Sequence, residues 1–100
     1  QFVADGVKLL ITIDCGTADF DTVGEAQAGG IDVIITDHHL IGEKIPKAFA
    51  MLNPKQADCK YPEKMLCGAG VVFKLVQAIN FKLSTLNFPL STPSGTLTIT

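Results

Sequence analysis

The sequence predicts an α/β fold in which a parallel βαβ unit is followed by a C-terminal helix. Two nearly uninterrupted apolar runs, residues 8–14 and 31–36, have the composition of strands that are buried on both faces. The segment between them is typical of a short helix and ends in two glycines. Because two strands joined by a helix run parallel with a right-handed crossover, this order predicts a parallel sheet.

The first three elements follow one another closely along the chain. The first strand is predicted over Lys8–Asp14, which reads KLLITID. Asp19 or Asp21 could cap a helix that runs to about Ala28, and glycine tolerates the left-handed conformation of the stop that follows. The second strand is predicted over Ile31–Thr36.

Two further elements are predicted downstream. Ala50–Asn53 has the pattern of a short third strand, which Pro54 stops. A helix is predicted over Gly70–Leu83, because its apolar residues recur at steps of three and four and form one buried stripe. The stripe consists of Val72, Leu75, Val76, Ile79 and Leu83. Residues 84–100 are predicted to be a tail or a truncated element, so the folded unit is residues 1–83.

The composition describes a small globular segment. The 100 residues are 47% hydrophobic and 18% charged, which provides enough apolar material for a core. No apolar run approaches the roughly 20 residues that span a bilayer, so no membrane association is expected. The three cysteines have no CxxC spacing, which favours a reducing, cytoplasmic compartment. Because the chain opens on Gln1 in mid-pattern, we expect an excised part of a larger domain.

Charge is divided unevenly along the chain. Residues 1–43 carry a net charge of −7, and residues 44–100 carry +5. An acidic half suits cations, whereas the lysine-rich half could meet phosphates or simply form a solvated surface.

Polar side chains follow both predicted strands of the βαβ unit. Asp14 closes the first strand, and Asp37, His38 and His39 close the second. Ligands gather at the carboxyl ends of parallel strands, and adjacent strands lie about 4.8 Å apart, so Asp14 and His38 could share a metal ion. A carboxylate with an imidazole suits Mn²⁺, Fe²⁺, Zn²⁺ or Co²⁺.

Structural alternatives exist for each of these residues. Asp14 could form an Asx turn, and the two histidines could be core or loop residues. Asp37 could orient His38, cap the next turn or bind metal directly. At the start of the last helix, the amides around Gly68 and Gly70 could hold a phosphate, although small residues there also allow close packing.

The ordered motifs resemble the DHH phosphoesterase superfamily. The run IITDHH, preceded by IDCG and a helix ending in Gly-Gly, carries the resemblance. The downstream stretches LNPK, DCKYP and LCGAGVVFKL resemble the branch of bacterial single-stranded-DNA-specific exonucleases. The match runs from about Lys8 to Ile79, which makes residues 1–83 a partial DHH catalytic domain with the second and third motifs only.

The resemblance implies roles for the strand-end residues. Asp14 matches an aspartate that bridges two Mn²⁺ ions, and His38 matches a metal ligand. His39 matches a residue at the scissile phosphate, Asp37 supports the motif, and the stretch from Gly68 to Phe73 matches a motif of the exonuclease branch. The first and fourth motifs would lie outside this chain, so the chain alone is expected to be inactive.

The implied protein is a Mn²⁺- or Mg²⁺-dependent enzyme with a two-metal site. It would degrade single-stranded DNA from 5′ to 3′ in recombination and repair, with repair-complex proteins as further partners. Two alternatives stay open: another phosphoesterase of the superfamily, acting on oligoribonucleotides, cyclic dinucleotides or pyrophosphate, or a non-catalytic scaffold. The sequence leaves the oligomeric state open.

Overall fold

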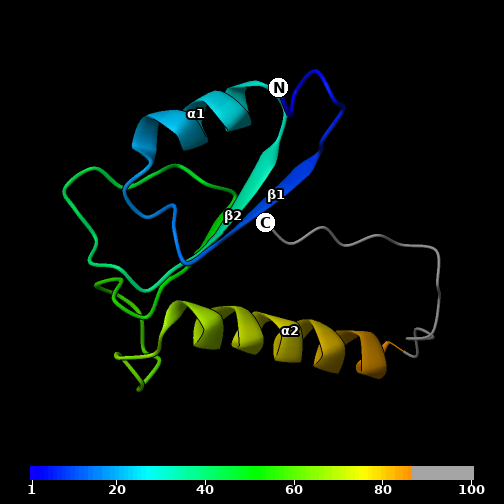
Figure 1. Cartoon of the computed structure of the whole chain (residues 1–100). Coiled ribbons are helices and arrows are strands. Elements are labelled where there is room, and N and C mark those ends of the chain that lie inside the picture. Colours follow the sequence, from blue (N-terminus) through cyan, green and yellow to red (C-terminus); the bar gives the residue numbers. More distant parts are fainter. Residues whose placement is uncertain (87–100) are drawn as a thin grey trace.

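The chain forms a three-stranded parallel sheet with a helix on each face. The computed structural model describes residues 1–86. Its elements are β1 (Leu9–Ile13), α1 (Phe20–Ala28), β2 (Asp32–Thr36), β3 (Ala50–Leu52) and α2 (Gly68–Thr85). The strand order is β1-β2-β3, and α1 and α2 lie on opposite faces of the sheet (Figure 1). The predicted α/β fold class is therefore confirmed.

The register of β1 and β2 brings their carboxyl ends to the same level. Leu9 pairs with Asp32 and Ile13 pairs with Thr36, so both strands end at one edge of the sheet. The backbone amide of Asp14 continues the ladder by donating to the carbonyl of Thr36 over 2.9 Å. The loops that leave β1 and β2 consequently start side by side.

The core is centred on β2. Val33 and Ile35 are fully buried, and with Ile31 and Val23 of α1 they form the main apolar cluster. Burial on both faces, predicted for both strands, holds for β2 but is wrong for β1, where Leu9 is 51% exposed. The reason is positional: β2 has a paired strand on each side, whereas β1 lies at the edge of the described sheet.

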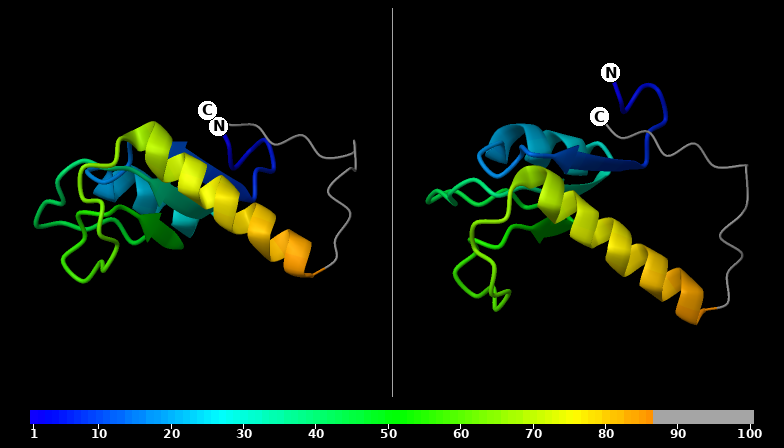
Figure 2. Two further views of the ribbon diagram at one scale, coloured as in Figure 1. Left: turned by 90° about the horizontal axis from the view of Figure 1, so that it is seen from below. Right: turned by 60° about the horizontal axis from the view of Figure 1, so that its bottom comes forward.

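The last helix differs from its prediction in two ways. It begins two residues earlier, at Gly68, and includes residues 84 and 85 of the predicted tail. Its buried side chain is Val71, whereas Val76 and Ile79 of the predicted stripe are about half exposed. The C-terminal half of α2 diverges from the sheet, so its apolar side chains lose contact with the core (Figure 2). Residues 87–100 lie outside the described part of the chain.

Within residues 1–86, neither helix combines the length and apolar character needed to cross a membrane.

The burial of β2 predicts a large difference between two isoleucines. Replacing the fully buried Ile35 by Ala should lower the free energy of unfolding by about 2–5 kcal/mol, because it removes apolar contacts and leaves a cavity. The matched Ile79→Ala should lower the free energy of unfolding much less, because the Ile79 side chain is 47% exposed and Ala favours a helix. Urea unfolding of the two variants checks this, and equal losses would contradict the assignment of the core.

Candidate metal centre

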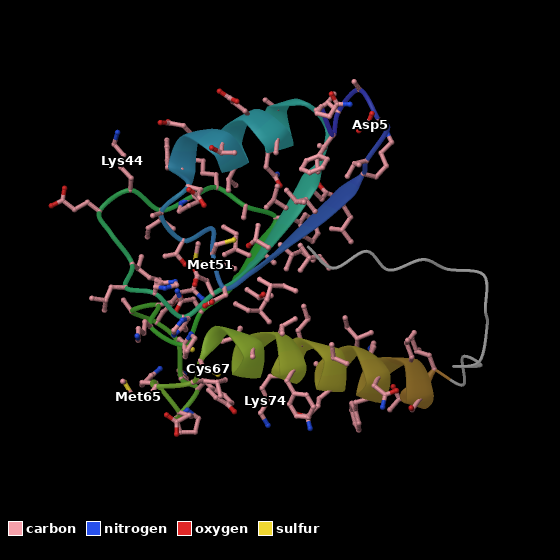
Figure 3. All side chains as sticks on the ribbon, in the orientation of Figure 1. Asp5, Lys44, Met51, Met65, Cys67 and Lys74 are labelled. Atoms are coloured by element: carbon pink, nitrogen blue, oxygen red, sulfur yellow. The ribbon has the colours of Figure 1, made fainter. Side chains whose placement is uncertain are left out.

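Four side chains converge at the carboxyl ends of β1 and β2. Asp14, Asp37, His38 and His39 each offer one ligand atom, and these atoms all lie within 4.8 Å of one another. The N-terminus of α2 approaches the same edge, where Cys67 lies at the start of the helix (Figure 3). The structure thus brings together all of the acidic and histidine residues that the sequence singled out.

Asp14 adopts an uncommon backbone conformation at the end of β1. Its φ of +62° lies in the left-handed region, which Asp tolerates better than most side chains. Its carboxylate is 59% exposed, and Oδ1 lies 2.9 Å from Nε2 of His38. The Asp14–His38 pair therefore presents an oxygen and a nitrogen together at the surface.

Gly68 allows the start of α2 to contact this pair. A Cβ atom added to Gly68 would lie 2.6 Å from Cγ and 2.7 Å from Cβ of Asp14, which is too close for any side chain. At Gly70, an added Cβ would lie 2.8 Å from Cγ of Leu66. Close packing against Asp14 thus accounts for Gly68, whereas at Gly70 only the flexible Leu66 side chain limits the space. The phosphate contact, the other alternative for these glycines, stays a prediction.

Asp37 is the buried member of the cluster, and donors surround its carboxylate. Oδ2 accepts from the Thr17 amide at 3.0 Å, and Oδ1 accepts from the His38 amide at 2.8 Å. Burial by itself raises the pKa of Asp37, but hydrogen bonds from the Thr17 hydroxyl and amide, the His39 ring and the His38 amide outweigh it. They hold the pKa of this carboxyl well below its usual range, so Asp37 is ionised at neutral pH.

His39 is held by Asp37 through one ring nitrogen. Nδ1 lies 2.6 Å from Oδ1 of Asp37, and because an ionised carboxylate only accepts, Nδ1 is the donor. The ring is 60% exposed, which leaves Nε2 available to an external group. Of the alternatives considered for Asp37, the structure favours a supporting role, but the ring it holds is that of His39, not His38.

The donor set fits a divalent transition metal. Asp14 and His38 provide the carboxylate and imidazole atoms that such ions prefer, with ring and carboxylate already in contact. Asp37 is less suited as a ligand, because its oxygens are occupied by the donors of Thr17, His38 and His39.

Sequence reasoning missed two buried polar residues beside the cluster. Thr17 follows β1 in the turn after Asp14, and Asn53 follows β3. By sequence alone, Thr17 is indistinguishable from ordinary loop sequence. Asn53 carried a signal, because it is a polar residue directly after the third strand, at the same edge as the other strand ends.

Comparison with known proteins assigns a family to this geometry. The family model "DHH family, N-terminal domain" matches residues 1–97. The chain belongs to the DHH family. The single-stranded-DNA-specific exonuclease RecJ of Dickeya dadantii is 45% identical over 83 residues, which cover 83% of this chain and 14% of that protein. RecJ of Bacillus subtilis is 47% identical over 74 residues, covering 74% of this chain and 9% of that protein. This DHH chain thus spans about one seventh of the length of the D. dadantii protein and 9% of the B. subtilis protein.

Two solved structures agree with this assignment. RecJ from Thermus thermophilus, in complex with Mn²⁺, has a TM-score of 0.63 and 30% identity, over 88% of this chain and 13% of that one. A second exonuclease RecJ, bound to manganese, has a TM-score of 0.65 and 31% identity, over 88% of this chain and 22% of that one. The DHH chain therefore shares the fold of the corresponding RecJ segments.

The depressed pKa of Asp37 predicts how its replacement acts at different pH. An aspartate whose pKa is lowered in the folded state stabilises the fold at pH values above its ordinary pKa of 3.8. This contribution is lost as the pH falls below 3.8 towards the folded-state pKa. In metal-free buffer, Asp37→Asn should be less stable than wild type at pH 7. The difference should narrow as the pH falls from about 5 towards 2.

Thermal or urea unfolding across this pH range measures the effect. Asp58→Asn, in an exposed loop, is the matched control and should follow wild type throughout. A gap between Asp37→Asn and wild type that stays constant with pH would contradict the ionised state of Asp37.

Proposed function

We propose that the chain is part of the catalytic domain of a metal-dependent exonuclease that hydrolyses single-stranded DNA from 5′ to 3′, in recombination and repair. The observation that carries the proposal is the Asp14–His38 pair at the ends of two adjacent parallel strands. The similarity to RecJ proteins, two of them solved with manganese, supports the substrate and the metal. Three free cysteines suit a cytoplasmic location.

Asp14 and His38 would hold Mn²⁺ or Mg²⁺ in a two-metal site. The Asp14 carboxylate has two oxygens and can bridge two ions, whereas the His38 ring offers a single nitrogen. When bound, such ions supply a hydroxide at neutral pH and neutralise charge on the phosphate. One carboxylate and one imidazole do not fill two coordination spheres, so further ligands would come from other segments of the full-length protein. We therefore expect the chain alone to be inactive.

The remaining residues of the cluster would act on the phosphate. With Nδ1 held by Asp37, His39 can direct Nε2 at a phosphate oxygen and stabilise the charge that develops there. Asp37 keeps the His39 ring in that orientation. At the start of α2, Gly68 lies against Asp14, so free backbone amides of the helix would be close enough to help hold the phosphate. Gly70 lies in the same first turn of α2, next to Leu66, and would take part in this contact with the phosphate.

Removing either proposed ligand should abolish activity in the full-length protein. With Mn²⁺ and 5′-labelled single-stranded DNA, Asp14→Ala and His38→Ala should show a larger loss of activity than residues that only support a metal site. Replacing such supporting residues typically lowers activity by about 10- to 100-fold. Circular dichroism should show that both variants remain folded. The control Asp58→Ala changes an exposed aspartate outside the cluster and should keep wild-type activity. Full activity of either ligand variant would refute the proposed site.

A panel of substrates separates this function from the alternatives. Long single-stranded DNA, a dinucleotide, a cyclic dinucleotide and pyrophosphate are offered to the wild-type protein with Mn²⁺. Cleavage confined to the small substrates would place the protein in another branch of the DHH phosphoesterases. No cleavage by a folded, full-length protein would favour a non-catalytic scaffold.

A further inference from the structure

We infer that Asn53 and Thr17 are positioning residues that hold His39 in place for the reaction, an inference that rests on the proposed function. Asn53 directly follows β3, and Thr17 lies in the loop after β1. Both are at least 98% buried, although neither contributes to the apolar core. Their side chains connect the loops that follow all three strands.

The side chain of Asn53 is oriented without ambiguity. Its Oδ1 accepts a hydrogen bond from the Lys55 amide at 2.9 Å, so Nδ2 must point the other way. Nδ2 donates to Oγ1 of Thr17 at 3.1 Å and to the backbone carbonyl of His39 at 2.9 Å. One amide group thereby ties the end of β3 to the loops after β1 and β2.

Thr17 passes this restraint on to Asp37. Its amide donates to Oδ2 of the Asp37 carboxylate at 3.0 Å, and its hydroxyl, which accepts from Asn53, faces the same carboxylate. Asp37 in turn binds the ring of His39. The result is a chain of hydrogen bonds that runs from Asn53 through Thr17 and Asp37 to His39.

His39 is thus fixed from two directions. Asn53 holds its backbone carbonyl, and Asp37 holds its ring. Without them, an exposed histidine on a loop would sample several rotamers, and a reacting group gains most when its geometry is set in advance. Within residues 1–86, no hydrogen bond joins Asn53 or Thr17 to the side chains of Asp14 or His38, so the expected effect is on turnover and not on metal binding.

The experiment measures steady-state cleavage of 5′-labelled single-stranded DNA by the full-length protein with Mn²⁺. Asn53→Ala and Thr17→Val should lower kcat by about 10- to 100-fold, with KM and the Mn²⁺ requirement largely unchanged. Thr17→Ser, which keeps the hydroxyl, should restore most of the activity. The controls Asn80→Ala and Thr22→Val, at exposed helix positions, should behave like wild type.

A second set of variants separates positioning from general stability. In a His39→Ala background, Asn53→Ala and Thr17→Val should cause no further loss, because the residue they position is gone. An equal loss in both backgrounds, or wild-type kcat in the single variants, would overturn the inference. If Asn53→Ala fails to fold, Thr17→Val and Thr17→Ser decide the question, since Val keeps the shape of Thr without its hydroxyl and Ser keeps the hydroxyl without the methyl group. No cleavage by the wild-type protein would instead overturn the proposed function, and this inference with it.

Discussion

The buried carboxylate of Asp37 organises the edge of the sheet on which the site is built. An ionised group in this position is tolerated only when donors replace the water that it has lost. Those donors come from Thr17, after β1, and from His38 and His39, after β2. Satisfying one charge therefore fixes the course of two loops, and Asn53 adds the loop after β3 through its bonds to Thr17 and His39.

A second constraint lies in the backbone at Asp14. A residue other than glycine with φ of +62° carries strain of about 1–3 kcal/mol, which persists only when its surroundings hold it. Here the Asp14 amide donates a hydrogen bond to the Thr36 carbonyl, and Gly68 of α2 lies against the Asp14 side chain. The turn at Asp14 thus helps to keep its carboxylate beside His38.

The fold and the cluster were predictable from local patterns, whereas the supporting network was not. Two apolar runs joined by a helix imply adjacent parallel strands, and Asp14 and His38 then fall at one edge. The bond from Asn53 to Thr17 joins residues 36 positions apart, and nothing in their spacing indicates it. The exposure of Val76 and Ile79 was missed for a related reason: a helical stripe shows which face is apolar, but not how far the sheet extends to cover it.

Exposure follows the chemistry that each residue is proposed to perform. Asp37 is buried and its oxygens are occupied, so it can orient a neighbour but has little capacity to bind anything new. His38 is 28% exposed, and Asp14 and His39 are about 60% exposed, so each keeps an atom accessible at the surface. The hydrogen bonds that satisfy the buried charge are the same ones that orient the exposed His39 ring. For this reason, a change at Asn53 or Thr17 can alter the orientation of the His39 ring, although neither residue belongs to the Asp14–His38 pair.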